Sequence, residues 1–389
     1  MTERHNRLGA PTLDVTMPTP TTDELLALFA RAGYRRVEPP ILQPVDAFLD
    51  LSGEDIRRRL FVTTSGDGDE LCLRPEYTIP VCRHVLAEAP AGGKVAHSYL
   101  GPVFRLRAGE SGEFLQAGIE SFGRTDREAA DAEVIGLALE ACAELGLAEP
   151  HIVLGDMALI TGLIDALGLD APTKRRVLRG VTAGRGIAAL EADANGGNGA
   201  DYAGLLTAIE GQDPKAARAF VEDVLNIAGI STVGGRTAGE IADRFLARAA
   251  RRADAPAGEA KAILERYLAV RGDPDAAAIQ IRKLAADASL DLGRAVDAFE
   301  ARTGFMAARG MGVERIAFSA EFARNLDYYT GFIFEVTDPR RPEWRPVAAG
   351  GRYDGLLEHL GAPSAVPAVG GALWLDRLGA GAAGKGGLA

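Results

Sequence analysis

The sequence predicts an α+β fold in which an antiparallel sheet is flanked by helices. Segments 94–104, 114–122 and 332–336 are short, carry β-branched and aromatic residues, and are bounded by glycine or proline. Such segments are typical of strands joined by turns or hairpins rather than by crossover helices. Helical patterns lie on either side of them, which favours helices packed against an antiparallel sheet.

The composition is that of a globular protein and disfavours two kinds of partner. At 389 residues the chain is long enough for roughly two or three domains, each with its own core. The formal net charge is −11, whereas proteins that grip a phosphate backbone usually carry a basic stripe. No nucleic-acid partner is therefore expected. Because no apolar run has the length of a membrane span or the form of a signal peptide, we expect a cytoplasmic protein without membrane association.

The cysteines and histidines do not indicate a metal site. Cys72, Cys82 and Cys142 lack the spacing of metal ligands, and the five histidines are scattered along the chain. The thiols of Cys72 and Cys82 have apolar neighbours, where a cysteine behaves as a small hydrophobic residue. The sequence therefore predicts neither a metal nor a cofactor.

Two polar pairs mark the beginnings of helices. Thr21 and Glu24 have the spacing of a capping box, in which each side chain covers a free backbone amide of the other residue. Apolar residues at helical intervals follow, and Gly33 is a natural stop. Thr125 and Glu128 repeat the capping pattern and predict a helix that runs to about residue 146.

The domain organisation follows from shifts in composition. Residues 172–303 are rich in alanine, arginine and acidic residues, and apolar positions recur at helical intervals over 216–228 and 260–270. We predict that 172–303 form a helical insertion in a core made of residues 21–171 and 304–378. The polar residues 1–20 and the glycine- and alanine-rich residues 379–389 are expected to be flexible.

Two segments are expected to present polar side chains on one side of the chain. In QAGIE, strand alternation puts Gln116, Gly118 and Glu120 on one face. The glycine between the two polar groups would let a small ligand approach closely. In LRPEYT, Glu76 and Thr78 lie two apart on an extended stretch and can face the same side, although a surface turn would have the same pattern.

Two further segments have an ordinary structural interpretation. Arg105 and Arg107 alternate out of a predicted strand and can simply be charges on an edge strand. Tyr328 and Tyr329 follow Arg324 and precede another predicted strand. Paired tyrosines more often fill a core than contact a ligand. Taken singly, none of these segments defines a function.

Taken together, the segments resemble the histidyl-tRNA synthetases. The order and rough spacing of that family are found in GYRRVEPPIL, LRPEYT, GPVFRLR, QAGIESFG, RNLDYYTGFIFE, AAGGRYDGLLEHLG and AVGGALWLDRL. The resemblance runs from about residue 13 to residue 378, apart from the predicted insertion. It implies the class II aminoacyl-tRNA synthetase-like fold, an antiparallel sheet with helices. Pro40 matches the proline of the first class motif, which lies at the dimer interface of the family, and so implies self-association as a dimer.

The resemblance also implies a pocket for free histidine. It assigns that pocket to Glu76, Thr78, Arg105, Gln116, Glu120, Arg324, Tyr328 and Tyr329. Carboxylates suit the ammonium group of an amino acid, and an arginine binds a carboxylate through two parallel hydrogen bonds. In the family, the arginine at the position of Arg324 meets the substrate carboxylate. Tyrosines can supply an aromatic wall for the imidazole ring.

The nucleotide side departs from the synthetase pattern. Arg107 stands where the second class motif has a glutamate that accepts a hydrogen bond from adenine, and the loop of residues 108–115 is shorter than in the family. Trp374 stands where the third motif has a glycine, so an indole would fill space that the nucleotide ring needs. The three arginines that serve activation in the family remain: Arg105, Arg324 and Arg377. Only twelve residues follow the last of these, so no anticodon-binding domain is expected.

These departures resemble the regulatory subunits of ATP phosphoribosyltransferase, paralogues of the histidyl-tRNA synthetases. The resemblance implies a non-catalytic subunit that joins the short-form catalytic subunit in a hetero-octamer, for the first step of histidine biosynthesis. It implies L-histidine as the effector that mediates feedback inhibition from the inherited pocket. Two alternatives stay open. The retained arginines favour an active histidine-activating enzyme, whereas the acidic charge disfavours a nucleic-acid-binding module.

Overall fold

The fold comes from a computed structural model of the chain. It describes residues 19–88, 93–106, 112–184, 232–233, 236–237, 258–324, 328–343 and 345–379. The helices in these ranges are α1 (Thr19–Arg31), α2 (Asp46–Arg57), α3 (Thr78–Glu88), α4 (Arg127–Glu144), α5 (Met157–Ala166), α6 (Ala171–Thr182), α11 (Gly258–Leu268), α12 (Pro274–Asp287), α13 (Gly293–Ala308), α14 (Leu356–His359) and α15 (Leu375–Gly379), with a 3₁₀ turn at Val313–Arg315. The predictions for residues 1–18, 216–228 and 380–389 lie outside the described ranges.

The strands form one large sheet and two small ones. Their bounds are β1 (Arg35–Arg36), β2 (Leu42–Pro44), β3 (Val62–Thr64), β4 (Glu70–Leu73), β5 (Val95–Phe104), β6 (Glu113–Phe122), β7 (His151–Asp156), β8 (Thr232–Val233), β9 (Arg236–Thr237), β10 (Arg271–Gly272), β11 (Ala317–Ser319), β12 (Phe332–Thr337), β13 (Ala348–Arg352) and β14 (Ala368–Trp374). The large sheet has the order β1-β5-β6-β14-β13-β12-β7-β11-β10, and the small sheets are β2-β4-β3 and β8-β9. The three strands expected from texture are therefore present as β5, β6 and β12.

The large sheet is mixed rather than wholly antiparallel. β1 runs parallel to β5, and β7 runs parallel to β11. Every other neighbouring pair in this sheet is antiparallel, including the long β5–β6 hairpin and the central strands β6, β14, β13 and β12. The prediction of an antiparallel sheet flanked by helices therefore holds for the centre of the sheet, and the two parallel pairs lie towards its edges.

The predicted helix beginnings need correction. The helix α1 begins at Thr19, two residues before the expected Thr21, although it ends as expected before Gly33, which has a φ of +90°. The helix α4 begins at Arg127 and has no side-chain cap. The Asp126 carboxylate that precedes it is held by the Arg124 guanidinium at 2.5 Å, so it does not cover the helix amides.

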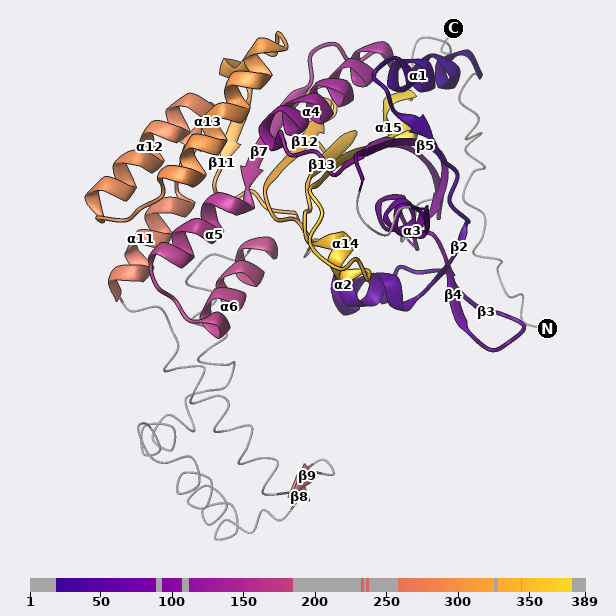
Figure 1. The fold of residues 1–389 in the computed structure, drawn as a ribbon, viewed down its shortest axis with the longest axis horizontal. Coiled ribbons are helices and arrows are strands. Elements are labelled where there is room, and N and C mark those ends of the chain that lie inside the picture. The colour runs from indigo at the N-terminus through magenta and orange to yellow at the C-terminus, as the bar shows by residue number, and fades with distance from the viewer. Residues whose placement is uncertain are drawn as a thin grey trace, which may run out of the picture.

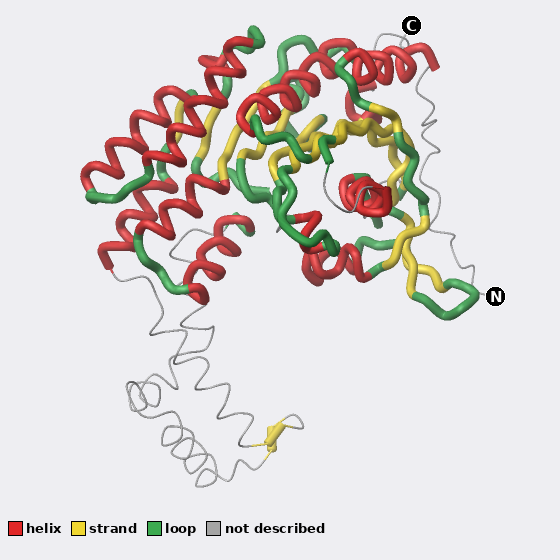
Figure 2. Tube along the Cα trace, viewed as in Figure 1, coloured by secondary structure: helices red, strands yellow, loops and turns green. Residues whose placement is uncertain are grey.

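Helices cover both faces of the large sheet. On one face, α1 and α4 pack against the sheet around a core that includes Phe29, Ile135 and Phe334. On the other face, α3 lies within the curve of the sheet, with α2 and α14 beside it (Figures 1 and 2). The side chains of successive residues in β6 point alternately to the two faces of the sheet, as they do along any strand. Ile119 faces the core under α4, and Phe122 faces the core around α3.

A group of helices lies at one end of the large sheet. α11, α12 and α13 lie beside the end formed by β7, β11 and β10 (Figure 1). α11, α12 and most of α13 lie in the range 172–303 that was expected to be helical, although α13 runs on to Ala308, and α11 contains most of the predicted segment 260–270. The short strand β10 in the same range pairs with β11, so this range also contributes to the large sheet. Among the described helices, none combines the length and the apolarity that crossing a bilayer requires.

A buried ion network joins these layers. Asp131 on α4 accepts hydrogen bonds from Arg302 on α13 at 3.1 Å and from Arg352 on β13 at 2.9 Å. Arg302 also donates to Asp156 at 2.7 Å, and Asp156 caps α5 through the amide of Ala158. A buried charge is tolerated only when it is paired and hydrogen-bonded. The network therefore fixes α4, α5 and α13 in one position against the sheet.

We expect Asp131→Asn to destabilise the fold strongly. The change would leave two buried guanidinium groups short of negative charge, which typically costs about 3–5 kcal/mol of unfolding free energy. Urea denaturation of the purified chain measures this loss. The control is Asp297→Asn on α13, which removes an exposed partner of Arg282 and should cost less than about 1 kcal/mol. Equal losses for the two variants would contradict the structural role of the network.

Candidate functional site

A cavity of about 340 Å³ lies over the centre of the large sheet. Its floor is formed by β6, β13 and β14, and its walls by the beginning of α3 and by Ala323, Arg324, Tyr328 and Tyr329. All but one of the residues assigned to a ligand pocket from the sequence line it: Glu76, Thr78, Arg105, Gln116, Arg324, Tyr328 and Tyr329. The exception is Glu120, which lies directly beneath the lining. The fold thus brings together segments that are far apart in the sequence.

Glu120 is the most enclosed of these polar groups, with an exposure of 1%. Its carboxylate accepts hydrogen bonds from the hydroxyls of Thr78 at 2.8 Å, Tyr99 at 3.4 Å and Tyr353. Gly370 on the neighbouring strand β14 is necessary for this arrangement, because a Cβ there would collide with the carboxylate. The pairing of Gly370 with Glu120 in the sheet fixes that proximity.

Burial raises the pKa of Glu120 from its ordinary value of 4.5 to about 8. The nearby carboxylate of Glu76 raises this pKa further, while the hydroxyl donors Tyr353, Thr78 and Tyr99 lower it. Burial likewise raises the pKa of Glu76. Two carboxyl groups that share a site poor in water suit a cationic ligand, because a cation would stabilise the charged form of both.

Glu76 and Thr78 face the cavity, but they do not lie on an extended segment as the sequence suggested. The strand β4 ends at Leu73, and Thr78 is the first residue of α3. Glu76 accepts hydrogen bonds from the backbone amides of Thr78 at 2.6 Å and Ile79 at 2.9 Å. A carboxylate in this position caps the helix, so Glu76 has a structural role besides its place in the cavity wall.

Three tyrosines form an aromatic wall. The rings of Tyr328 and Tyr329 lie 4.9 Å apart at 49°, and Tyr328 meets Tyr353 edge-on at 5.8 Å. Tyr353 is a site residue that the sequence interpretation did not single out, although it lies within the quoted segment GGRYDGL. Glu335 is a second such residue, since it lines the cavity and pairs with Arg324.

The three arginines expected to serve activation are all engaged within the chain. Arg105 donates to the carbonyl of Pro75 at 2.7 Å. Arg324 donates to Glu335, and Arg377 donates to the carbonyl of Pro346.

Trp374 occupies the region where the family pattern has a glycine. Its indole ring lines the cavity, is 6% exposed and lies beneath the Arg377 guanidinium at 4.7 Å. Arg107 and residues 108–111 of the loop that was expected to be shorter lie outside the described residues, whereas residues 113–115 belong to β6.

Several buried polar atoms that belong to the cavity lining make no hydrogen bond within the chain. They are Gln116 Oε1, Arg324 Nε and Trp374 Nε1. A buried donor or acceptor without a partner is costly, and native proteins rarely leave one unmatched. The set contains an acceptor and two donors, so a small ligand with both kinds of group could satisfy it.

Comparison with known proteins gives the same picture of the fold. The family model for histidyl-tRNA synthetase matches residues 19–225 and 218–378. A solved structure from Bacillus halodurans, described as an ATP phosphoribosyltransferase regulatory subunit/histidyl-tRNA synthetase, has a TM-score of 0.64 and 21% identity over 96% of this chain and 83% of that chain. A histidine–tRNA ligase subunit from Alicyclobacillus acidocaldarius has a TM-score of 0.57 and 25% identity over 99% of both chains.

Curated relatives are closer in sequence. Proteins named ATP phosphoribosyltransferase regulatory subunit from Brucella canis and Brucella ovis are each 42% identical over 346 residues, which cover 88% of this chain and 92% of the relative. The fold and the matched segments define a class II synthetase-like protein of the histidyl-tRNA synthetase type. Within that class, the chain belongs to the family of ATP phosphoribosyltransferase regulatory subunits.

We expect the stability of the chain to depend on pH through Glu120. Between its ordinary pKa of 4.5 and its folded pKa of about 8, the folded state holds a proton that the unfolded state has released. Stability is therefore greatest below pH 4.5 as far as this group is concerned, and it falls as pH rises towards 8. Glu120→Gln removes this titration. The unfolding free energy of the variant should therefore rise relative to that of the wild type by about 1.4 kcal/mol for each pH unit in that window.

Urea denaturation at about pH 5.5 and about pH 7.5 measures this difference in unfolding free energy. The control is Glu300→Gln, because its partner Arg282 lowers the pKa of Glu300 below the tested window. The difference in unfolding free energy between the wild type and Glu300→Gln should therefore be the same at both pH values. If the difference in unfolding free energy between the wild type and Glu120→Gln is also the same at both pH values, Glu120 is already ionised in the folded chain.

Proposed function

We propose that this chain is a non-catalytic regulatory subunit that binds L-histidine in the cavity over the sheet. Its partner is the short-form catalytic subunit of ATP phosphoribosyltransferase, and the complex performs the first step of histidine biosynthesis in the cytoplasm. The observation that carries the proposal is the asymmetry of the cavity. The amino-acid side keeps its polar groups, whereas an indole stands on the nucleotide side. The name of the Brucella relatives supports the regulatory role.

Histidine fits the chemistry of the amino-acid side. Its ammonium group suits the carboxyls of the half-buried Glu76 and the buried Glu120, and the guanidinium of Arg324 suits its carboxylate. The imidazole ring would lie against Tyr328 and Tyr329 and could donate to the unmatched Gln116 Oε1. A cavity of about 340 Å³ is near the lower end of the range for small-molecule sites, about 300–1,000 Å³, which favours a ligand of amino-acid size.

Trp374 and Arg377, at the positions that face the nucleotide in the synthetases, support a subunit without synthetase activity. A nucleotide base needs a flat space beside the backbone, and Trp374 fills space of that kind. Arg377 stacks on the indole and donates to the Pro346 carbonyl, so its guanidinium is engaged within the chain. The arginines that favoured an active enzyme thus have roles within this chain. This reasoning makes the histidine-activating enzyme the weaker of the two candidates.

Feedback requires that histidine distinguish two states of the assembly. A ligand with equal affinity for both states would shift nothing, however tightly it bound. Residues of α2, α3 and four strands line the cavity together with Arg324, Tyr328 and Tyr329, so a small movement of one part against another would change its shape. We propose a hetero-octamer that contains synthetase-like dimers joined near Pro40.

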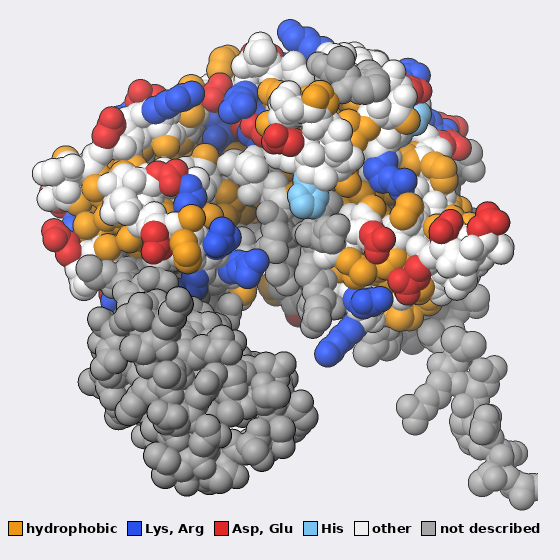
Figure 3. All heavy atoms as spheres, turned by 60° about the horizontal axis from the view of Figure 1, so that its bottom comes forward, with side chains coloured by type: hydrophobic (Ala, Val, Ile, Leu, Met, Phe, Trp, Pro, Cys, Tyr) orange, Lys and Arg blue, Asp and Glu red, His pale blue; other side chains and the backbone are white. Residues whose placement is uncertain are grey.

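The acidic charge supports a protein partner rather than nucleic acid. On the face drawn in Figure 3, basic and acidic side chains are interspersed with apolar ones over the described surface. Binding of tRNA that weakens with salt near physiological ionic strength would contradict this part of the proposal.

We expect the chain to activate a short-form catalytic subunit and to make it sensitive to histidine. The rate of ATP condensation with phosphoribosyl pyrophosphate should rise when the two purified proteins are mixed, and L-histidine should lower it. A coupling of about 1–3 kcal/mol corresponds to roughly 5–150-fold in affinity. Histidine-dependent exchange of pyrophosphate with ATP by the chain alone would instead establish the histidine-activating enzyme.

Changes in the cavity should weaken the inhibition. In the reconstituted complex, Glu120→Ala and Tyr328→Phe should each raise the histidine concentration for half-inhibition about tenfold or more, because each removes a buried polar contact worth at least about 1.4 kcal/mol. The matched control is Tyr267→Phe on α11, whose buried hydroxyl makes no hydrogen bond and lies outside the cavity lining. Full histidine sensitivity in both cavity variants would refute the assignment of the pocket.

A further inference from the structure

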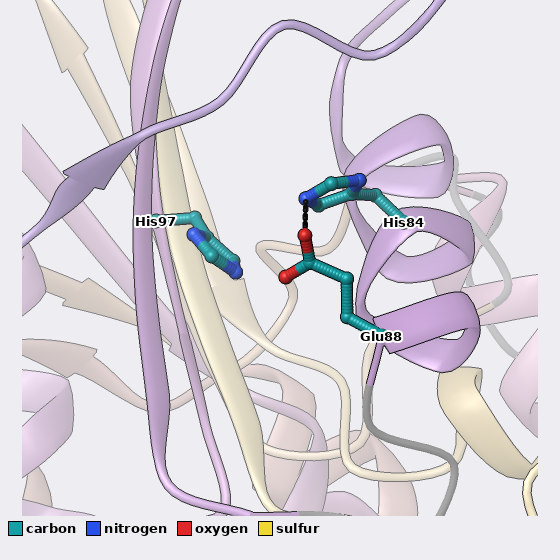
Figure 4. Close-up of side chains that lie close together, drawn as sticks. All are labelled: His84, Glu88 and His97. Carbon is teal, nitrogen blue, oxygen red and sulfur yellow. Dashed lines mark ion pairs between the residues drawn. The ribbon is translucent and has the colours of Figure 1, made fainter.

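Three side chains outside the cavity form a compact cluster of metal-binding type. His84 and Glu88 lie one turn apart on α3, and His97 projects towards them from β5 (Figure 4). One ligand atom from each residue lies within 4.8 Å of the other two. Residues four apart on a helix share a face, so the helix presents an imidazole and a carboxylate together to the strand.

His97 is the least explained member of the cluster. Its side chain has no exposed surface, and its Nδ1 lies 3.4 Å from the backbone carbonyl of Arg35. Its Nε2 is buried without a hydrogen-bond partner in the chain and is directed at Glu88 and His84 (Figure 4). If Nδ1 carries the ring proton towards the carbonyl, Nε2 presents a lone pair. This arrangement is common for histidines that bind metals, in which a backbone carbonyl holds the second nitrogen.

We propose that His84, Glu88 and His97 bind a divalent transition-metal ion, with Zn²⁺ as the expected occupant. Two imidazole nitrogens and one carboxylate oxygen are a ligand set that zinc accepts, with solvent in the fourth position. Zinc lies about 2.0–2.2 Å from such atoms, so the three ligand atoms would close by a small amount from their present spacing. His84 and Glu88 can do this by side-chain rotation, since both are partly exposed.

The surrounding charges are compatible with an ion at this point. Glu88 directs Oε2 at the Arg35 guanidinium, 2.8 Å away, and Oε1 at His84 Nε2, 3.2 Å away. One carboxylate oxygen is thus held in place while the other faces the cluster. Glu88 is also the last residue of α3, and the C-terminal end of a helix favours a cation.

A simple ion pair between His84 and Glu88 accounts for the cluster less well. That pair brings His84 Nε2 to 3.2 Å from Glu88, but neither His84 Nε2 nor the buried His97 Nε2 makes a hydrogen bond within the described chain. The edge-to-face contact of the two imidazoles, with centroids 5.7 Å apart at 67°, does not supply a partner for either nitrogen. An ion between the three side chains would satisfy all of them and would join α3 to the edge of the large sheet.

The test uses the full-length chain without an affinity tag, stripped with a chelator and titrated with ZnCl₂ in a calorimeter. We expect one ion per chain, together with a rise in melting temperature, because an ion that binds only the folded state stabilises it. His84→Gln and Glu88→Gln should each weaken zinc binding at least about tenfold. The matched control is His151→Gln on β7, an exposed histidine outside the cluster, which should bind zinc as the wild type does.

Cobalt substitution identifies the ligands independently. With nitrogen and oxygen ligands, Co²⁺ should show visible bands without a thiolate charge-transfer band. That band would appear if Cys72, Cys82 or Cys142 bound the ion, and it would overturn the assignment. Zinc affinity unchanged in both His84→Gln and Glu88→Gln would also overturn it. These two positions carry the test because they are not fully buried, so their substitution leaves the core intact, whereas His97 lies inside it.

Discussion

The buried pairing of Asp131 with Arg302 and Arg352 is the interaction on which the arrangement of this chain depends. It joins α4, α13 and the central strand β13. Arg352 also supports the cavity. Its backbone carbonyl accepts from the amide of Thr330 at 2.9 Å, and its side chain lies against Gly331. The segment that carries Tyr328 and Tyr329 is therefore anchored to the network, and Tyr353, the residue that follows β13, donates to Glu120. An ion pair of this kind is often weak as a source of stability, but it specifies one geometry because any displacement leaves a charge unpaired.

That geometry makes the cavity a place where separate elements meet. The carboxyl of Glu120 comes from β6, the hydroxyl of Thr78 from the start of α3, and that of Tyr353 from the end of β13. A ligand that binds these groups contacts the helix layer and the sheet at once. Regulation by population shift would require such a ligand to have different affinities for two arrangements of these layers. The same helix α3 ends at the cluster of His84 and Glu88, so its two ends lie at the two sites described for this chain.

The sequence was sufficient for much of the fold, and the limits of that prediction have physical causes. The strands β5, β6 and β12 were predictable because their residue types suit a pleated, buried surface. The beginnings of the helices were less predictable. At α4, for example, the Asp126 carboxylate accepts a hydrogen bond from Arg124 rather than from the helix amides. Seven of the eight residues assigned to the pocket line one cavity, and Glu120 lies just beneath it. The family resemblance, rather than the residue pattern alone, supplied that assignment. Tyr353 and Glu335 were missed because their roles depend on partners more than ten residues away or on another strand. The His84, Glu88 and His97 cluster escaped notice because its ligands come from a helix and a strand, with no spacing typical of a metal motif.

The retained arginines show why residue identity alone is a poor guide to retained chemistry. In an active synthetase such groups must be directed at the reacting substrates, since catalysis depends on positive charge placed where negative charge develops. Here Arg324 is neutralised by Glu335, Arg105 is bound to the Pro75 carbonyl, and Arg377 lies over Trp374. Each arginine stabilises the wall of the cavity, so each would be kept even if nucleotide binding had been lost. Trp374 is different, because a glycine in that position would leave the space open and would remove the surface on which Arg377 rests. The indole of Trp374 therefore both lines the cavity and gives the retained Arg377 a structural role.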